Sequence, residues 1–312
     1  FIDDLEPVAG IRHAAILRSD HAHARILSID TSKAEALPGV TGVVTGSRVA
    51  ETISPIPSAV RVPIKFYPIA LDRVRYVGEP VAVVIAEDRY VAEDALELIN
   101  VDYEALPATA DPEAAMADNA ILLHEDVGSN VVHHRTFQYG DPDGAFERAD
   151  RVVKLDWRYP RYASTPMETY GMVANFEKQP DRYTIWSNFQ GPFILHALMT
   201  GALGVPGNRL RLITSPHSGG SFGIKQAMFP YMVLLAACSR LLGCPVKWIE
   251  DRLEHLTASS TGADRADGVE AAFSDDGELL ALKFNNIVNV GAFVRAPEPA
   301  SVYQMHSASN GC

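Results

Sequence analysis

The 312-residue sequence has little cysteine, an excess of acidic over basic residues and no long apolar run. Its three cysteines, Cys238, Cys244 and Cys312, are too few for a disulfide framework in a chain of this size, and they include no CxxC pair that would predict a zinc or iron–sulfur site. No stretch approaches the roughly 18 apolar residues of a membrane span, and no signal peptide is visible. These absences favour a cytoplasmic protein without a membrane partner.

The charge balance narrows the expected partners further. Acidic residues outnumber basic ones by 39 to 27, which gives a formal net charge of −12. Nucleic acids and anionic membranes are bound by basic surfaces, so neither is an expected partner. A small-molecule substrate and protein partners fit this charge better. The sequence starts at Phe1 and residues 307–312 form no obvious closing element, so we expect a fragment of a longer polypeptide.

Residues 1–108 are predicted to form one compact α/β domain. Apolar patterns favour strands and one clear helix, at 11–17, 24–29, 40–44, 81–86, 88–99 (helix) and 101–103. The last three elements form a βαβ-like unit. The proline-rich segment 53–68 is predicted to be a surface loop. His21 and His23 would share a face on a strand, but no third ligand is found near them, so no protein-held metal is expected.

A linker and a second domain follow. Alanine, aspartate, proline and glycine dominate residues 109–130, as in an interdomain linker. Residues 131–312 are predicted to form a mixed domain with strands at 151–159, 172–176 and 183–187, a helix at 193–202 and a hairpin around residues 275–277. The first of these strands places Val153, Leu155 and Trp157 on one face. The fold class is therefore α+β.

One glycine-rich segment stands out as a candidate ligand loop. Residues 215–226, SPHSGGSFGIKQ, lie between a predicted strand at 210–213 and a predicted helix with apolar positions from Ala227 to Cys238. Glycines at such a turn let backbone N–H groups approach a polar or anionic ligand, although plain tight packing is the alternative. The glycine spacing matches neither the P-loop nor the dinucleotide-binding fingerprint.

Several stretches together resemble one known family. GGSFGIK at residues 219–225 is similar to the GGGFGGK segment of the xanthine dehydrogenase/aldehyde oxidase family of molybdenum hydroxylases, which includes the large subunit of aerobic carbon monoxide dehydrogenase. Phe189-Gln190 resembles the family's glutamine segment, and Pro166-Met167-Glu168 resembles its P-M-E element. Residues 19–26 and 76–82 are similar to stretches of its a/b hammerhead domain. The resemblance implies a hammerhead domain over 1–108 and the first part of a molybdopterin-binding domain over 131–312.

This resemblance also implies a cofactor and its ligands. A molybdenum-molybdopterin cofactor, expected in the cytosine dinucleotide form, would be bound by Gln190, Gly220, Ser221, Phe222 and Gly223. Gln190 would approach the apical oxo ligand, since a neutral amide can donate a hydrogen bond without replacing a metal ligand. Taken without the family, Gln190 would equally be a strand-end amide that caps the next helix. Iron–sulfur and FAD centres are expected on partner subunits.

The sequence departs from the family pattern at three positions. Ser221 and Ile224 replace two glycines, and Ile224 is expected to crowd a ligand from its side. Gln226, a candidate substrate-pocket residue, stands where several purine-oxidising members carry a glutamate, which argues against a purine substrate. The family's catalytic glutamate is expected beyond Cys312.

Three hypotheses follow from these features. The leading one is the N-terminal part of the molybdopterin-binding catalytic subunit of a molybdenum hydroxylase that oxidises an aldehyde or N-heterocycle. Its expected partners are an iron–sulfur subunit, an FAD-binding subunit and the C-terminal half of the molybdopterin domain. The second is a carbon monoxide dehydrogenase large-subunit type. The third is a cofactor-less scaffold or assembly homologue, which only Ser221 and Ile224 support.

Overall fold

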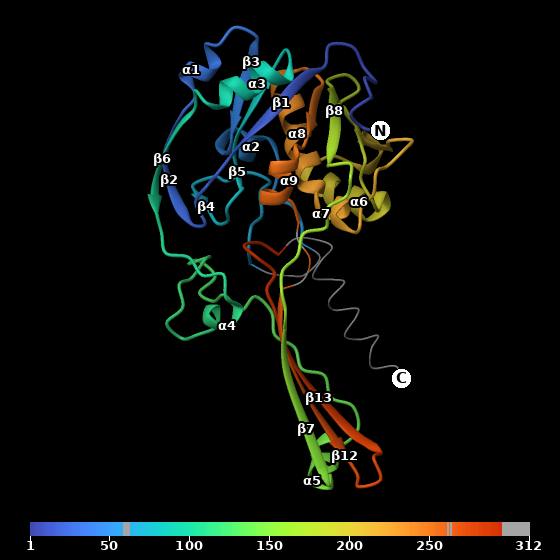
Figure 1. Ribbon diagram of the computed structural model, residues 1–312. Coiled ribbons are helices and arrows are strands. Elements are labelled where there is room, and N and C mark those ends of the chain that lie inside the picture. Colours follow the sequence, from blue (N-terminus) through green and yellow to red (C-terminus); the bar gives the residue numbers. More distant parts are fainter. Residues whose placement is uncertain (59–62, 261, 263, 295–312) are drawn as a thin grey trace. The chain divides into compact units, whose positions relative to one another are not determined.

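The computed structural model describes residues 1–58, 63–260, 262 and 264–294 (Figure 1). Contacts divide these residues into two compact units. The larger unit contains the described part of 1–107, all of 163–260 and the residues described from Ala292 onward. The smaller unit contains 108–162 and the described part of 261–291. Within the described residues, no helix is both long and apolar enough to cross a membrane.

A seven-stranded mixed sheet is the centre of the larger unit. Its order is β10-β9-β8-β11-β1-β5-β3. In sequence order, the strands are β1 (Arg12–Arg18), β3 (Val40–Thr45), β5 (Pro80–Ala86), β8 (Gly171–Glu177), β9 (Arg182–Ser187), β10 (Leu210–Thr214) and β11 (Val246–Ile249). β1 pairs in parallel with β11, opposing Arg12 to Val246, so the sheet joins strands that lie more than 200 residues apart.

Helices cover both faces of this sheet. Every residue of β5 is buried, and the side chains of residues 82–86 alternate between two core clusters. Val83 and Ile85 pack in the cluster that contains α8 (Phe229–Leu242), whereas Ala82, Val84 and Ala86 pack with α3 (Arg89–Leu96). The continuous apolar run of β5 is therefore that of a strand covered on both sides.

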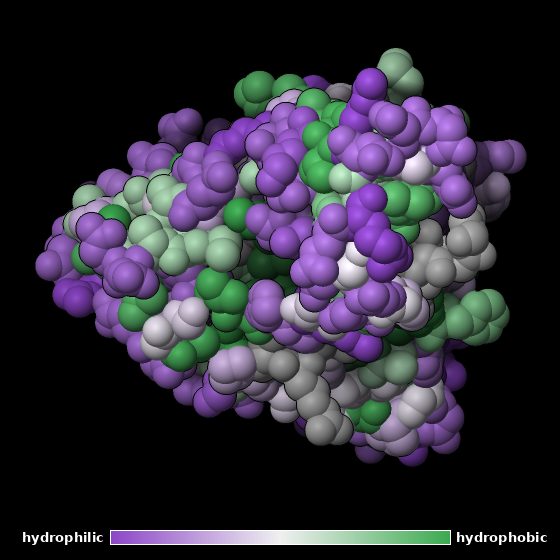
Figure 2. Space-filling model, turned by 90° about the horizontal axis from the view of Figure 1, so that it is seen from below, coloured by the Kyte–Doolittle hydropathy of each residue, from purple (hydrophilic) through white to green (hydrophobic). Residues whose placement is uncertain are grey.

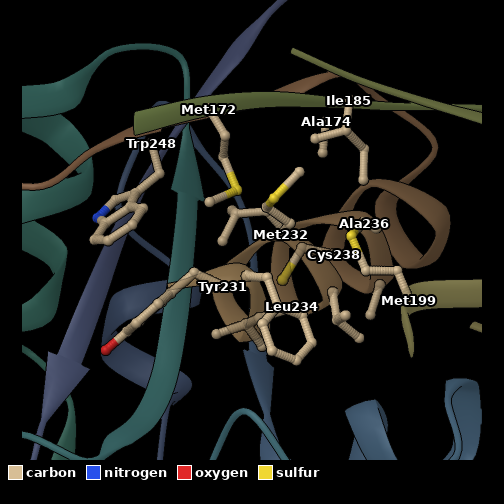
Figure 3. Packing of buried hydrophobic residues seen from close by; sticks show 14 of the residues in the cluster. Met172, Ala174, Ile185, Met199, Tyr231, Met232, Leu234, Ala236, Cys238 and Trp248 are labelled. Atoms are coloured by element: carbon tan, nitrogen blue, oxygen red, sulfur yellow. The ribbon is translucent and has the colours of Figure 1, made fainter. Parts of the chain in front are cut away.

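The core between α8 and the sheet is built from large apolar side chains. In Figure 3, Met232 of α8 lies against Met172 of β8, and Leu234 packs on the other side of the helix within the same cluster. Tyr231 stacks on Trp248 of β11 with ring centroids 4.9 Å apart. Each such buried side chain stabilises the fold by about 1.5–3 kcal/mol. This core supports the end of the sheet from which the glycine-rich loop leaves.

The predicted βαβ-like unit is wrong in its pairing. The helix at 88–99 is α3, capped by Asp88, whose side chain accepts from the Val91 N–H at 2.9 Å. The strand after it, β6 (Asn100–Ala105), lies in a separate antiparallel sheet of order β4-β2-β6, with β2 (Ala24–Asp30) and β4 (Arg73–Val74). β6 alternates between exposed and half-buried residues, which suits a sheet with one solvent face and not the doubly covered sheet.

Shorter elements connect these sheets. The other helices of the larger unit are α1 (Ser32–Glu35), α2 (Gly46–Thr52), α6 (Pro192–Leu203), the 3₁₀ helix η1 (Gly207–Arg209), α7 (Ile224–Ala227) and α9 (Arg252–Ala258). The described residues of the segment 53–68 form no helix or strand, as predicted. They are not simply a surface loop, because Ile56 and Phe66 are buried in the main core.

The smaller unit is an antiparallel three-stranded sheet of order β13-β12-β7. Its elements are α4 (Pro112–Ala115), α5 (Pro142–Glu147), β7 (Arg151–Tyr159), β12 (Arg265–Phe273) and β13 (Leu279–Val288). The predicted strand at 151–159 and the predicted hairpin are confirmed, and Gly277 supplies the positive φ of +87° that the hairpin turn requires.

One face of this small sheet is apolar and exposed. Val269 of β12 opposes Leu155 of β7 on one side and Phe284 of β13 on the other, so the three side chains form a row across the sheet. Leu155 and Phe284 are 58% and 56% exposed. Figure 2 shows green, apolar residues among purple, hydrophilic residues on the face of the molecule that is seen from below. We call the row Leu155, Val269 and Phe284 the apolar row.

Candidate functional site

The glycine-rich loop follows β10 directly and leads into two helices. β10 ends at Thr214, α7 begins at Ile224, and α8 begins at Phe229, so the predicted single helix is divided near Met228. Pro230 explains the division, because proline is favoured in the first turn of a helix and cannot continue the preceding one. The loop therefore lies, as predicted, between a strand and a helix N-terminus.

The turn of this loop has an unusual backbone. Gly220, Phe222 and Gly223 have φ values of +98°, +51° and +90°. This left-handed conformation is uncommon for a residue with a bulky side chain such as Phe222. The ring of Phe222 is 77% exposed, so burial of the ring does not explain the conformation.

Hydrogen bonding in the turn is one-sided. Its carbonyl groups are engaged: Gly219 O accepts from the Glu168 N–H, Ser221 O from the Ile224 N–H, Gly223 O from the Gln226 N–H and Phe222 O from the Ser164 hydroxyl. By contrast, the N–H groups of residues 220–223 donate to no acceptor within the described part of the chain. A run of free N–H donors forms a site for an anionic or otherwise electron-rich ligand.

Gln190 joins this turn from another element. It lies just beyond β9 and is exposed, and its Oε1 accepts a hydrogen bond of 2.7 Å from the Ser221 hydroxyl. The N-cap of α6 is Gly191, without a side-chain cap, so the alternative in which Gln190 caps that helix is wrong. The structure thus places Gln190, Gly220, Ser221 and the following two residues in one cluster.

Gln226, the substrate-pocket candidate, lies beside Gly191 and is half-buried. A Cβ atom on Gly191 would be 2.8 Å from the Gln226 Nε2, and Gly191 also has a φ of +74°. The glycine therefore permits the close approach of α7 to the segment that carries Gln190.

A buried ion pair fixes the position of the glycine-rich loop. Glu168 Oε2 accepts from the Gly219 N–H at 2.8 Å and from the Lys225 Nζ at 2.7 Å, and Oε1 accepts from the Ile2 N–H at 3.3 Å. Burial alone would raise the pKa of Glu168, but the hydrogen bonds from Lys225 and Gly219 outweigh it and lower the pKa below its usual value. With its oxygens engaged, Glu168 is a structural carboxylate.

Gly219 is required by this packing. A Cβ atom added there would lie 2.5 Å from the Cβ of Glu168, closer than non-bonded carbon atoms approach. The P-M-E element and the glycine-rich loop both occur in the sequence, but the contact between Glu168 and Lys225 was not predicted. A glutamate and a lysine 57 positions apart carry no local signal of their pairing.

A second buried pair anchors the segment that carries Glu168. His255 Nδ1 lies 2.8 Å from Glu250 Oε2 and Nε2 lies 2.9 Å from the Ser164 carbonyl oxygen. A carboxylate oxygen and a carbonyl oxygen both accept hydrogen bonds, so this geometry favours the protonated form of the ring. The hydrogen bond to Glu250 accordingly raises the pKa of His255. Tyr170 N–H also donates to Glu250 Oε2, which fixes the other end of the segment.

Other residues singled out in the sequence lie elsewhere. Ile224 is buried in the main core, so the expectation that it crowds a ligand is wrong. Cys238 is completely buried, which confirms its interpretation as a small core residue. His21 and His23 precede β2 and do not lie on a strand; His23 contacts the Pro107 carbonyl and His21 packs on Tyr103.

Comparison with known families relates both parts of the chain to one family. Residues 123–312, which include the whole cluster, match the molybdopterin cofactor-binding domain. Residues 1–107 match the aldehyde oxidase and xanthine dehydrogenase a/b hammerhead domain. The chain belongs to the xanthine dehydrogenase/aldehyde oxidase family. The resemblance found in the sequence and the α+β fold class are thereby confirmed.

Members of this family are similar along almost the whole chain. The carbon monoxide dehydrogenase large chain of Afipia carboxidovorans is 36% identical, over 96% of this chain and 38% of its own length. The nicotine 6-hydroxylase large subunit of Paenarthrobacter nicotinovorans is 34% identical, over 97% and 37%. The structure of quinoline 2-oxidoreductase from Pseudomonas putida 86 superposes with a TM-score of 0.88 at 35% identity, over 95% and 38%. The chain thus spans less than two fifths of the length of these relatives.

The residues of the cluster fit a molybdopterin cofactor. Such a group presents oxo and phosphate oxygens, which are hydrogen-bond acceptors, and the turn presents donors only. A Cβ atom on Gly223 would meet no atom within 4 Å, so that side of the turn is open to a ligand. In the described residues, no three His, Cys, Asp or Glu side chains gather as a metal site.

Proposed function

We propose that this chain is the N-terminal part of the molybdopterin-binding catalytic subunit of a molybdenum hydroxylase. The observation that carries the proposal is the run of free N–H donors at residues 220–223 beside Gln190, inside the region that matches the molybdopterin cofactor-binding domain. The cofactor, when bound, would supply the two-electron oxidation that adds water-derived oxygen to a C–H bond of an aldehyde or N-heterocycle.

In this proposal, the residues of the chain position and orient the cofactor and the substrate. The N–H groups of 220–223 would hold acceptor oxygens of the cofactor, and the Gln190 Nε2 would donate to an oxo group. The exposed ring of Phe222 would provide an apolar wall beside the reacting group, which limits the access of water. Glu168 and Lys225 keep the turn in place from the buried side. Gln226 is proposed as a substrate-pocket residue behind Gln190.

The finer identity of the cofactor and partners is part of this proposal. We expect the cytosine dinucleotide form of molybdopterin, with iron–sulfur and FAD centres on partner subunits. Several relatives are named as large chains or subunits, which supports a multi-subunit assembly. We further propose a cytoplasmic location, which the free thiols of Cys238 and Cys244 support.

A polypeptide equivalent to the rest of these relatives is proposed to complete the molybdopterin domain and to supply the catalytic glutamate. The apolar row on the smaller unit supports this, because a row of apolar side chains with two exposed members, Leu155 and Phe284, is typical of a surface that packs against further protein. The expected occupant is that polypeptide.

A carbon monoxide dehydrogenase type is the second candidate. The 36% identity to the Afipia carboxidovorans large chain favours it as much as the 34% identity to nicotine 6-hydroxylase favours a heterocycle. Assays of the native complex with aldehydes, N-heterocycles and carbon monoxide would separate the two candidates.

Molybdenum content tests the proposal most directly. The complex is purified from its native operon, and elemental mass spectrometry gives the molybdenum per chain. We expect about one molybdenum atom per chain. Its absence, in a host whose other molybdoenzymes are loaded, would overturn the proposal and favour the cofactor-less scaffold.

A further inference from the structure

The hydrogen bond between Ser221 and Gln190 decides which end of an amide faces the ligand. The serine hydroxyl lies 2.7 Å from the Gln190 Oε1 and joins residues 31 positions apart. A primary amide has an accepting end and a donating end, and a half-turn about its last side-chain bond exchanges them. With Oε1 turned to Ser221, the Nε2 group is turned away from it.

The kind of ligand that the turn suits favours this orientation over the reverse one. A serine hydroxyl can donate or accept, so the hydroxyl by itself would tolerate either end of the amide. Ser221, however, lies within the run of free N–H groups at 220–223. In the reverse orientation, Oε1 would face the acceptor oxygens of a ligand bound to these N–H groups, whereas the orientation in the structure leaves the NH₂ group to donate to them.

We propose that Ser221 is a positioning residue that holds the Gln190 amide with its NH₂ group presented to an oxo group or oxoanion. Ser221 thus supplies the partner that Oε1 needs in this orientation, a contact that glycine at the same position could not make. The inference rests on the proposed function for the identity of the natural ligand, but the hydrogen-bond geometry itself does not.

The test uses the full chain labelled with ¹⁵N, which is titrated with molybdate, a tetrahedral oxoanion. NMR follows two sets of signals, the Gln190 side-chain NH₂ group and the backbone N–H groups of 220–223. In the wild type, both sets of signals are expected to shift together. In Ser221→Ala, the backbone signals should still shift, but the Gln190 response should be lost and molybdate binding should weaken about fivefold, the effect of one hydrogen bond.

Two further variants make the result specific. Ser221→Thr keeps the hydroxyl and is expected to restore the Gln190 response. Ser47→Ala removes another exposed serine hydroxyl, bonded to the Thr45 hydroxyl and remote from the loop in sequence, and should leave both responses unchanged. Unshifted backbone signals of the core in each variant show that the fold is retained.

An unchanged Gln190 response and affinity in Ser221→Ala would overturn the proposal, as would failure of the wild-type Gln190 signal to shift. These outcomes are separate from the molybdenum content of the native complex. A native complex without molybdenum would overturn the proposed function, but the role of Ser221 in oxoanion binding would still hold. A native complex with molybdenum, together with an unchanged molybdate response in Ser221→Ala, would support the proposed function and overturn the role of Ser221.

Discussion

Lys225 Nζ lies 2.7 Å from Glu168 Oε2, and the lysine side chain is only 1% exposed. This ion pair connects the buried side of the glycine-rich turn to the segment that precedes β8. A buried charge that loses its partner is strongly destabilising, whereas replacement of both charges by neutral groups is much less so. The pair is therefore the structural basis of the turn's position.

Glu168→Gln is expected to lower the free energy of unfolding by about 3–5 kcal/mol, because the Lys225 ammonium would stay buried without its counter-charge. The double variant Glu168→Gln/Lys225→Met should recover part of that loss. Urea denaturation of the full chain measures both. As a control, Glu177→Gln breaks the half-exposed pair with Arg182 and should cost less than about 1 kcal/mol. Equal losses for the two single variants would contradict a special role for the buried pair.

Stability is predicted to depend on pH through His255. Its pKa is raised in the folded state, so its contribution is complete below the unfolded value of about 6.5 and is lost as the pH rises through the folded value. Urea midpoints measured between about pH 5.5 and 8.5 should therefore fall for the wild type relative to His255→Gln. His21→Gln removes a half-buried histidine from the same unit and serves as the control. A constant difference between wild type and His255→Gln across this range would argue against the buried imidazolium.

Gly219→Ala is expected to destabilise the chain by about 1–3 kcal/mol, since its Cβ would overlap the Cβ of Glu168 at 2.5 Å. Thermal unfolding followed by circular dichroism measures the loss. Gly207→Ala is the matched control, because its Cβ would meet only the edge of the His196 ring at 3.3 Å and should cost at most about 1 kcal/mol. Similar melting temperatures for the two variants would show that the Glu168 contact adapts freely.

Cys238 is predicted to resist alkylation in the native protein. Burial raises the pKa of its thiol to about 12, so very little of the reactive thiolate is present at pH 8. Iodoacetamide followed by peptide mapping should label Cys238 only in denaturant. Cys244 is half-buried and provides an internal comparison, with slow native labelling expected. Native labelling of Cys238 at the denatured rate would show that the α8 core opens readily.

Local pattern predicted much of the secondary structure. The alternation over residues 151–159 corresponds to β7, and the turn at 275–277 to the β12–β13 hairpin. The helix after the loop ends where Gly243 adopts a left-handed conformation. Such features follow from side-chain period and from backbone freedom, both of which act over a few residues.

Pairing between distant segments could not be predicted in this way. The parallel pairing of β1 with β11 depends on which strands pack into the sheet that helices cover on both faces. The place of β6 in another sheet depends on its pairing with β2, which suits its half-exposed residues. The buried position of Ile224 was missed for a related reason. At the start of a short helix, the direction of a side chain is set by the core that the helix meets.

The sequence by itself determined which groups are available: glycines that permit positive φ, an amide at position 190, a serine at position 221 and a family resemblance that names the cofactor. Only the tertiary structure decided how they are used. It engages the carbonyl groups of the turn, gives the N–H groups of 220–223 no acceptor among the residues that it describes, and brings Ser221 to Gln190. The physical reason is that hydrogen bonds between residues far apart in sequence depend on the packed positions of whole elements, which no local pattern of residues contains.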